Sequence, residues 1–357
     1  MQNLSRGKHL PLLPYFEKFI YDSKKGKRLQ PNGKSFARGT LVNYEMTKKL
    51  LEEFSEKKEF ELRISSVRRL NKRQLSTEKN YWKKFYKKFT DFLYNEKGYF
   101  DNSTGSVVKN IKVFFNYLNK DLLLEVGEFH KSFYVRKEEI PIIALLPEEL
   151  NFFIYSKEFE SSLSKRLKEI KDFFVFGCTV GLRFSDLIKL NRTNLRMIND
   201  DWWLVVRTKK TGTDILMKLP EYAKAIISTY KSQGKKLLPS FNSSNCGKYL
   251  KELVEVAGFT QEVSRIRQRR GKDIQVLKIY TRGKVSYRFC DHVSSHTMRR
   301  TSISTMLSLG VPEQIVRKIS GHSPGSKEFY RYVAFSQLYQ DNEISKMFER
   351  LKEKVFA

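Results

Sequence analysis

The sequence predicts a mainly α-helical protein with a small antiparallel β-sheet, in which a helical N-terminal domain precedes a mixed α/β domain. Before about residue 125, apolar residues recur at helical spacing and no strand pattern of comparable strength appears. Between residues 195 and 219, short runs of β-branched and aromatic residues alternate with turn residues, as in an antiparallel meander. Further on, the helical pattern returns and continues to the end. A chain of 357 residues is long enough for two domains.

The N-terminal part is expected to hold a basic arm and then a small helical domain. Residues 1–34 are polar, basic and rich in turn formers, which indicates an irregular arm. Residues 35–130 are expected to form the helical domain. Residues 131–145 carry charge and an interrupting Pro141, which indicates an extended linker. The helices expected in this domain lie at about 40–54, 76–95 and 103–118.

The mixed domain is expected to span residues 146–357. It opens at Leu146-Pro147-Glu148-Glu149, where proline in the first turn and acids near the positive end of the helix dipole favour a helix start. A hairpin is expected at 274–289, turning at Arg282-Gly283-Lys284. The segment 341–356 suits an amphipathic helix, which packs either on a neighbouring subunit or on its own domain. Further helices are expected at about 162–179, 184–190, 221–232 and 246–257.

The charge of the chain points to a polyanionic partner. Lys and Arg number 68 against 39 Asp and Glu, giving a formal net charge of +29 and a pI near 9.8. Self-repulsion on that scale opposes a compact fold unless a polyanion binds. We find no amphipathic anchor or lipidation signal, so nucleic acid is favoured over a membrane surface. No apolar run approaches the roughly 18 residues that span a bilayer, and a signal-peptide core is absent, so a cytoplasmic protein is expected.

Two separated segments carry residues that suit phosphodiester chemistry. Ser295–Val333 holds His296 and Arg299 one helical turn apart, then a Gly-His pair and two tyrosines. A planar guanidinium can bind two phosphate oxygens, and an imidazole N–H can donate to another position. Upstream, the segment 181–187 adds a second arginine beside a carboxylate. The candidates are Arg183, Asp186, Lys210, His296, Arg299, His322, Tyr330 and Tyr332.

Each of these residues also has an ordinary structural interpretation. His296 and Arg299 could form a surface pair at a helix N-terminus, and Asp186 could merely be the i,i+3 partner of Arg183. His322 could be a satisfied core residue, and Lys210 an exposed turn lysine. Only their combination, in one order over about 150 residues, favours the chemical interpretation. The three cysteines are widely scattered without zinc-ligand spacing, and no metal site is expected.

That order resembles the tyrosine recombinase (phage integrase) family. The resemblance covers most of the chain from about residue 35, although its specific motifs lie only between 181 and 333. It implies a SAM-like core-binding domain at 35–130 and a catalytic domain at 146–357, and it looks closest to mobile-element integrases of Bacteroidetes-like bacteria. The family pattern of Arg in GLRxSDL, Lys on a β-turn, HxxRR, GH and Tyr matches at Arg183, Lys210, His296, Arg299, His322 and Tyr332.

One position departs from the family pattern. The nucleophile of the family typically comes nine residues after the histidine of GH, where this chain has Arg331. Tyr330 comes at eight and Tyr332 at ten, and on a helix they point about 200° apart, so at most one faces the site. Tyr332 is favoured because its local sequence resembles the family pattern, and the turn 323–326 could absorb one inserted residue.

Basic clusters are further candidates for contact with DNA. Four lysines interleave with Trp82, Phe85, Tyr86 and Phe89 on one expected helix, which is equally the pattern of an aromatic core stripe with a solvated face. Such a face would give affinity more than sequence choice. Arg300 is expected to contact a phosphate or to be structural. The candidates for DNA contact are Lys83, Lys84, Lys87, Lys88, Arg265, Arg267, Arg269, Arg270 and Arg300.

The resemblance implies site-specific DNA strand exchange through a 3′-phosphotyrosine, without metal, ATP or other cofactor. Asp186 would hold Arg183 in place, and Lys210 would protonate the departing 5′-oxygen. The implied partners are a double-stranded recombination site, a homotetramer formed on DNA from free monomers, and DNA-bending accessory proteins at a bacterial nucleoid. A type IB topoisomerase-like enzyme and a DNA-binding protein of the same fold without strand exchange remain alternatives.

Overall fold

A computed structural model describes residues 9–355, apart from 69, 210, 211, 213, 232, 233, 281, 282, 323 and 324. The chain divides into two compact units. The first contains the described residues up to Ile140, together with Ile266–Val276. The second contains Pro141–Arg265 and the residues from Leu277 onward. The division at 140–141 falls within the expected linker, but the expected domain 146–357 is interrupted, because one of its segments belongs to the first unit.

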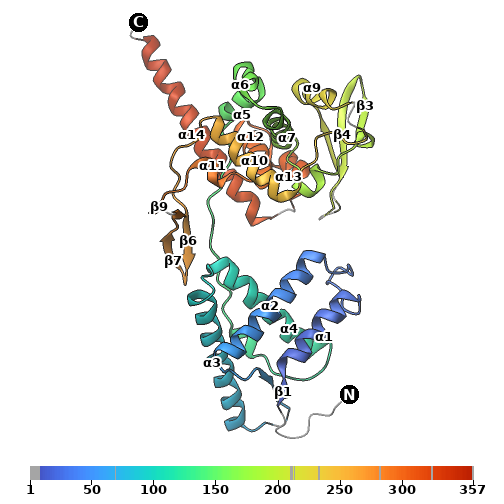
Figure 1. The fold of residues 1–357 in the computed structure, drawn as a ribbon, viewed down its shortest axis with the longest axis vertical. Helices are drawn as coiled ribbons and strands as arrows, with labels where there is room; N and C mark the ends of the chain where they lie inside the picture. Colours follow the sequence, from blue (N-terminus) through green and yellow to red (C-terminus); the bar gives the residue numbers. More distant parts are fainter. Residues whose placement is uncertain are drawn as a thin grey trace. The chain divides into compact units, whose positions relative to one another are not determined.

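The first unit is helical and encloses an aromatic core (Figure 1). Phe19, Phe54, Phe85 and Phe114 are all buried in one cluster. Asn71 caps the third helix in a capping box with Gln74, so this helix begins four residues before the expected start at 76. The elements before the linker are β1 (Leu10–Pro11), α1 (Leu12–Lys24), α2 (Arg38–Lys57), β2 (Arg63–Ile64), α3 (Lys72–Asn95), α4 (Asp101–Lys120) and the short 3-10 helix Phe129–Ser132.

Helix α1 lies where an irregular arm was expected. The expectation for residues 1–34 is wrong over 12–24, where Leu12, Phe16, Phe19 and Ile20 are buried in the core of the unit. These residues recur at helical spacing, so α1 is amphipathic and buries its apolar face. The turn formers at 24–34 belong to the connection after the helix, and the irregular structure that they indicate does not reach back over residues 12–24.

The second unit is built around helix α12 (Figure 1). This helix contacts α5, α7, α10, α13 and α14, so its residues are held from several sides. Met298 and Ile303 on it are fully buried. The helices of the unit are α5 (Pro147–Tyr155), α6 (Lys157–Ser162), α7 (Lys165–Val180), α8 (Phe184–Leu187), the 3-10 helix Arg192–Asn194, α9 (Glu221–Thr229), α10 (Ser243–Val256), α11 (Phe289–His292), α12 (Ser295–Ser308), α13 (Glu313–Ser320) and α14 (Lys327–Val355).

The strands confirm the expected meander and add a hairpin that was not expected. β3 (Leu195–Ile198), β4 (Asp201–Arg207) and β5 (Asp214–Lys218) form an antiparallel sheet in chain order. The expected hairpin within 274–289 is present as β8 (Lys278–Tyr280) and β9 (Gly283–Val285), but Gly283 and Lys284, which were expected in its turn, pair with Tyr280 and Ile279 as strand residues. The additional hairpin, β6 (Ile266–Arg269) and β7 (Lys272–Gln275), contains most of the predicted arginine cluster.

The C-terminal amphipathic segment is the last part of a longer helix, because α14 is continuous from Lys327 to Val355. Among the described helices, none combines the length and apolar character needed to cross a bilayer.

Candidate active site

Two glycines end helices beside the candidate site. Gly181 caps α7 with φ 61° and Gly321 caps α13 with φ 62°, both in the left-handed region that glycine adopts without the penalty of a Cβ. Arg183 follows Gly181 by two residues and His322 follows Gly321 directly. In both motifs the glycine therefore ends a helix, and the candidate residue follows within two positions.

Arg299 joins the ends of these two helices. It comes from the buried face of α12, and its side chain is 2% exposed. Nη1 donates to the carbonyl of Gly181 at 2.9 Å, and Nη2 donates to the carbonyl of Ser320. The positive guanidinium thereby satisfies carbonyls at two helix C-termini, where cations are favoured. It also fixes the two turns that carry Arg183 and His322.

The cationic candidates act on one another electrostatically. Burial, and after it the charge of Arg183, lowers the pKa of Arg299 to about 10. Burial, and after it the charges of nearby arginines including Arg299 and Arg183, lowers the pKa of His296 and of His322 to about 4. The contacts of Arg299 with Gly181 and Ser320 agree with these effects, because they bring Arg299 close to the turns that carry Arg183 and His322. Both histidines are neutral at pH 7, and each therefore has one N–H to donate.

The histidines differ in their surroundings. His322 is half-buried, and its Nδ1 lies 2.7 Å from Oγ of Ser320. His296 is exposed at the start of α12. Its helix is capped by Ser294, whose hydroxyl accepts the backbone N–H of His296 at 3.3 Å. Because water reaches His296, burial lowers the pKa of His322 more securely than that of His296.

Asp186 contacts the β4–β5 turn. Its Oδ1 accepts the backbone N–H of Lys209 at 3.2 Å, one residue before the predicted proton donor. Lys210 itself lies outside the described residues. Oδ2 of Asp186 and Nη1 of Arg183 are buried, and neither has a hydrogen-bond partner among the described residues. The expected support of Arg183 by Asp186 stays a prediction.

The two candidate nucleophiles have opposite environments. Tyr332 is 6% exposed, and its ring centroid lies 6.0 Å from that of His322. It also contributes to the electrostatic environment of Arg299. Tyr330 is 55% exposed and lies beneath the guanidinium of Arg317 at 4.9 Å. Tyr332 is therefore the candidate that lies beside His322 and close enough to affect Arg299.

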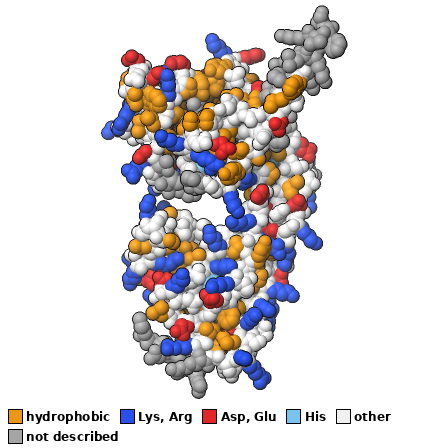
Figure 2. Space-filling view, turned by 180° about the vertical axis from the view of Figure 1, so that it is seen from behind, with side chains coloured by type: hydrophobic (Ala, Val, Ile, Leu, Met, Phe, Trp, Pro, Cys, Tyr) orange, Lys and Arg blue, Asp and Glu red, His pale blue; other side chains and the backbone are white. Residues whose placement is uncertain are grey.

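The predicted basic clusters differ in whether their side chains are exposed or bound to other protein groups. The four lysines of α3 are exposed, while Trp82, Phe85 and Phe89 are buried. Figure 2 shows Lys and Arg side chains over much of one face of the molecule. Arg265 lies over the ring of Tyr287 at 4.8 Å, and Arg300 is half-buried. Contact of these residues with DNA stays a prediction, and the other predicted arginines have protein partners described below.

The described residues hold no cluster of three or more His, Cys, Asp and Glu side chains that could bind a metal ion. Cys178, Cys246 and Cys290 are buried free thiols, and burial raises the pKa of each. They therefore belong to the core and not to the site.

A buried tyrosine beside His322 and close to Arg299, on a helical fold with a small antiparallel sheet, fits the class of DNA strand transferases that act through a tyrosine. Residues 153–337 match the phage integrase family. The match covers more than half of the chain, and the chain belongs to this family. The protein is a site-specific tyrosine recombinase.

Solved structures of the same fold have DNA bound. XerH site-specific recombinase, in a post-cleavage complex with a palindromic difH substrate, is 12% identical with a TM-score of 0.59, covering 98% of this chain and 100% of that chain. A lambda integrase tetramer on a Holliday junction is 14% identical with a TM-score of 0.56, covering 90% and 84%. The Tn1549 transposon integrase, in complex with transposon right end DNA, is 14% identical with a TM-score of 0.54, covering 96% and 100%. No curated protein matches the chain significantly.

Proposed function

We propose that the protein cuts and rejoins duplex DNA through a 3′-phosphotyrosine formed on Tyr332. The observation that carries this assignment is the position of Tyr332. It is buried with its ring 6.0 Å from His322, whereas Tyr330 is exposed beneath Arg317. This difference supports Tyr332 over Tyr330, because the ring of Tyr332 lies beside a histidine of the proposed site.

The proposed step exchanges one phosphodiester for another. Oη of Tyr332 gives its proton to water or to the unprotonated ring nitrogen of a neutral histidine and attacks the scissile phosphorus; a P–O bond forms to the tyrosine, and the P–O5′ bond breaks. Arg183 and Arg299 neutralise charge on the non-bridging oxygens, and the neutral histidines His296 and His322 donate hydrogen bonds. Lys210 gives its proton to the departing 5′-oxygen. Attack by a 5′-hydroxyl from a second duplex reverses the step and joins new strands.

The proposed reaction needs no metal ion and no ATP. The two guanidinium groups supply the positive charge that metal ions supply in other phosphoryl-transfer sites. The phosphotyrosine retains the energy of the bond that was cut. Adduct formation in EDTA, with no nucleotide added, is the expected result. A requirement for Mg²⁺ would contradict this part of the proposal.

The assembly that we propose is a tetramer on DNA formed from free monomers. Lambda integrase has been solved as a tetramer on a Holliday junction, and this chain shares its fold. We further propose that the enzyme is the integrase of a bacterial mobile element, acting in the cytoplasm at the nucleoid with DNA-bending accessory proteins. Footprinting on the ends of the element would identify the recombination site.

A nicked suicide duplex carrying the footprinted site tests the nucleophile. The unmutated protein and Tyr330→Phe should form a covalent adduct on a denaturing gel, and Tyr332→Phe should not. The reverse pattern would transfer the role to Tyr330. No adduct on a footprinted site would favour a DNA-binding protein without strand exchange. Relaxation of supercoiled DNA that lacks the site would favour a topoisomerase.

A further inference from the structure

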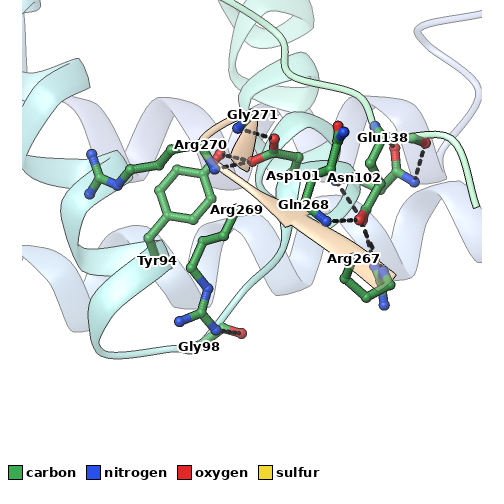
Figure 3. A network of polar contacts seen from close by, with 10 residues as sticks. All are labelled: Tyr94, Gly98, Asp101, Asn102, Glu138, Arg267, Gln268, Arg269, Arg270 and Gly271. Carbon is green, nitrogen blue, oxygen red and sulfur yellow. Dashed lines mark hydrogen bonds and ion pairs between the residues drawn. The ribbon is translucent and has the colours of Figure 1, made fainter. Parts of the chain in front are cut away.

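The β6–β7 hairpin belongs in sequence to the second unit but packs in the first. It follows α10 and precedes β8, yet residues Ile266–Val276 are part of the N-terminal unit. There the hairpin contacts the start of α4 and the segment around Glu138 (Figure 3). The chain therefore passes between the units at three places, after Ile140, after Arg265 and after Val276.

One buried carboxylate recognises the turn of the hairpin. Asp101, at the start of α4, is 1% exposed. Its two oxygens accept the backbone N–H groups of Arg270 and Gly271, each at 2.8 Å, and Oδ1 also accepts the hydroxyl of Tyr94 at 2.6 Å. The contact depends on backbone geometry and not on which side chain stands at 270.

The geometry of that turn is specific. Arg269 pairs with Lys272, which leaves a two-residue loop. Its residues, Arg270 and Gly271, have φ 58° and 77°. Positive φ at both central positions is the mark of a type I′ turn, and successive N–H groups in such turns form an anion-binding concavity. Asp101 occupies this concavity.

A second buried carboxylate holds the β6 strand. The side chain of Glu138 is 1% exposed and accepts Nε and Nη2 of Arg267 at 3.0 and 2.6 Å. It also accepts the backbone N–H of Gln268 at 2.6 Å. Burial alone would raise the pKa of Glu138, but these hydrogen bonds outweigh it and lower the pKa below its ordinary value. A bidentate Arg–carboxylate pair with a further N–H is among the stronger polar contacts in proteins.

The arginines of the hairpin are turned toward aromatic rings of the same unit. The guanidinium groups of Arg267 and Arg269 lie 4.5 and 5.2 Å from the ring of Phe100, and that of Arg270 lies 4.8 Å from the ring of Tyr94. Such contacts stabilise a cation without DNA.

We propose that the hairpin is a second tie between the two halves of the enzyme, and that Asp101 and Glu138 are positioning residues that hold this tie in place for binding of both units to one DNA site. The proposal rests on the proposed function. With one linker, each unit would bind DNA as a tethered but independent module. A docked hairpin restricts their relative freedom, which lowers the entropy lost when both units bind one site. Arg267 then holds the hairpin on the first unit through Glu138 and does not neutralise a phosphate of the bound DNA.

Hydrogen exchange of peptides that cover residues 266–276, in the free full-length protein, tests the docking. Slow exchange is expected in the unmutated protein, because Asp101 protects the turn amides. Asp101→Asn should raise the exchange rate of the turn about tenfold or more, since an amide nitrogen cannot accept an N–H. Asp91→Asn is the matched control: Asp91 binds the guanidinium of Arg270, at 2.6 Å on the surface, and not the turn amides, so exchange should not change.

A variant on the hairpin side guards against misfolding of the helices. Gly271→Val leaves every helical residue in place but forces a branched side chain to φ 77°, with its Cβ 3.3 Å from Nη1 of Arg136. It should raise exchange as Asp101→Asn does. Arg270→Gly keeps the turn N–H groups and suits positive φ, so it should retain protection. Unprotected amides in the unmutated protein, or equal exchange in Asp101→Asn and Asp91→Asn, would overturn the proposal.

Binding to the footprinted duplex tests the positioning role. Asp101→Asn and Gly271→Val should weaken binding about tenfold, leave the adduct rate at saturating protein unchanged, and leave the salt dependence of binding unchanged. Unchanged affinity despite faster exchange would overturn the role, as would a salt slope reduced by about one in Arg267→Gln. If the unmutated protein binds but forms no adduct, the proposed function fails, while the exchange and affinity results still decide the role of the hairpin.

Discussion

At the scale of single residues, the motifs combine chemistry with backbone geometry. The sequence pattern indicated Arg183, His322 and Arg299 by residue type, and the second unit brings their charges together. It did not indicate that Arg299 binds the carbonyls of Gly181 and Ser320. That contact requires two helices to end at one place, and no local pattern encodes the meeting of segments more than 100 residues apart.

The cap at Gly181 yields a stability prediction. Gly181→Ala should destabilise the protein by about 1–3 kcal/mol, because alanine is strained at φ 61° and its Cβ would lie 2.7 Å from Oγ of Ser302. Gly247→Ala is the control. Gly247 lies inside α10, where a Cβ would meet no described atom within 4 Å, so alanine should stabilise by about 0.5–1 kcal/mol. Urea unfolding measures both, and equal effects would contradict the role of the cap.

The depressed pKa of His322 predicts how stability depends on pH. Its pKa is about 4 in the folded protein and near 6.5 in the unfolded chain. Between these pH values the unfolded chain binds the proton more readily than the folded protein. The contribution of neutral His322 to the free energy of unfolding is therefore complete above pH 6.5 and is lost as pH falls toward 4. The melting temperature of His322→Asn should therefore fall less steeply than that of the unmutated protein over this window. Parallel curves would show that His322 has an ordinary pKa.

At the scale of elements, the sequence predicted well where local signals were strong. The meander β3–β4–β5 and the start of α5 follow from turn residues, proline and alternating apolar residues. The β6–β7 hairpin was missed because half of its residues, Ile266–Gln275, are charged, and Ile266 and Ile274 are its only apolar side chains. Their partners Asp101 and Glu138 are distant in sequence, and only tertiary structure shows that these arginines bind carboxylates.

Helix α14 yields a prediction about assembly. Ile344 is 50% exposed and Phe348 is 56% exposed, so neither is covered by the described residues of its own unit. Replacing both with serine should leave the melting temperature and single-site adduct formation unchanged, but should remove complexes that contain two duplexes on a native gel. Gln337→Ser, at an exposed polar position on the same helix, should change neither. Loss of stability in the double variant would instead indicate docking on the same chain.

At the scale of the whole molecule, the net charge of +29 predicts binding that depends steeply on salt. A protein that neutralises six to ten phosphates loses roughly 10³–10⁵ in affinity between 50 and 200 mM salt. If the exposed lysines of α3 contact the backbone, Lys84→Gln with Lys87→Gln should reduce the salt slope by about two. Lys97→Gln is the control, because Lys97 pairs with Glu53. Equal slopes in all three proteins would leave α3 a solvated face.

The proposed mechanism of the whole enzyme depends on which tyrosine is the nucleophile, and trypsin cleavage distinguishes Tyr330 from Tyr332. Cleavage after Lys327, Arg331 and Lys346 puts Tyr330 and Tyr332 on different peptides. Mass spectrometry of the adduct trapped on a suicide duplex, after nuclease treatment, should find the nucleotide mass on the peptide that begins at Tyr332. The same mass on the peptide that ends at Arg331, or on neither, would contradict the assignment.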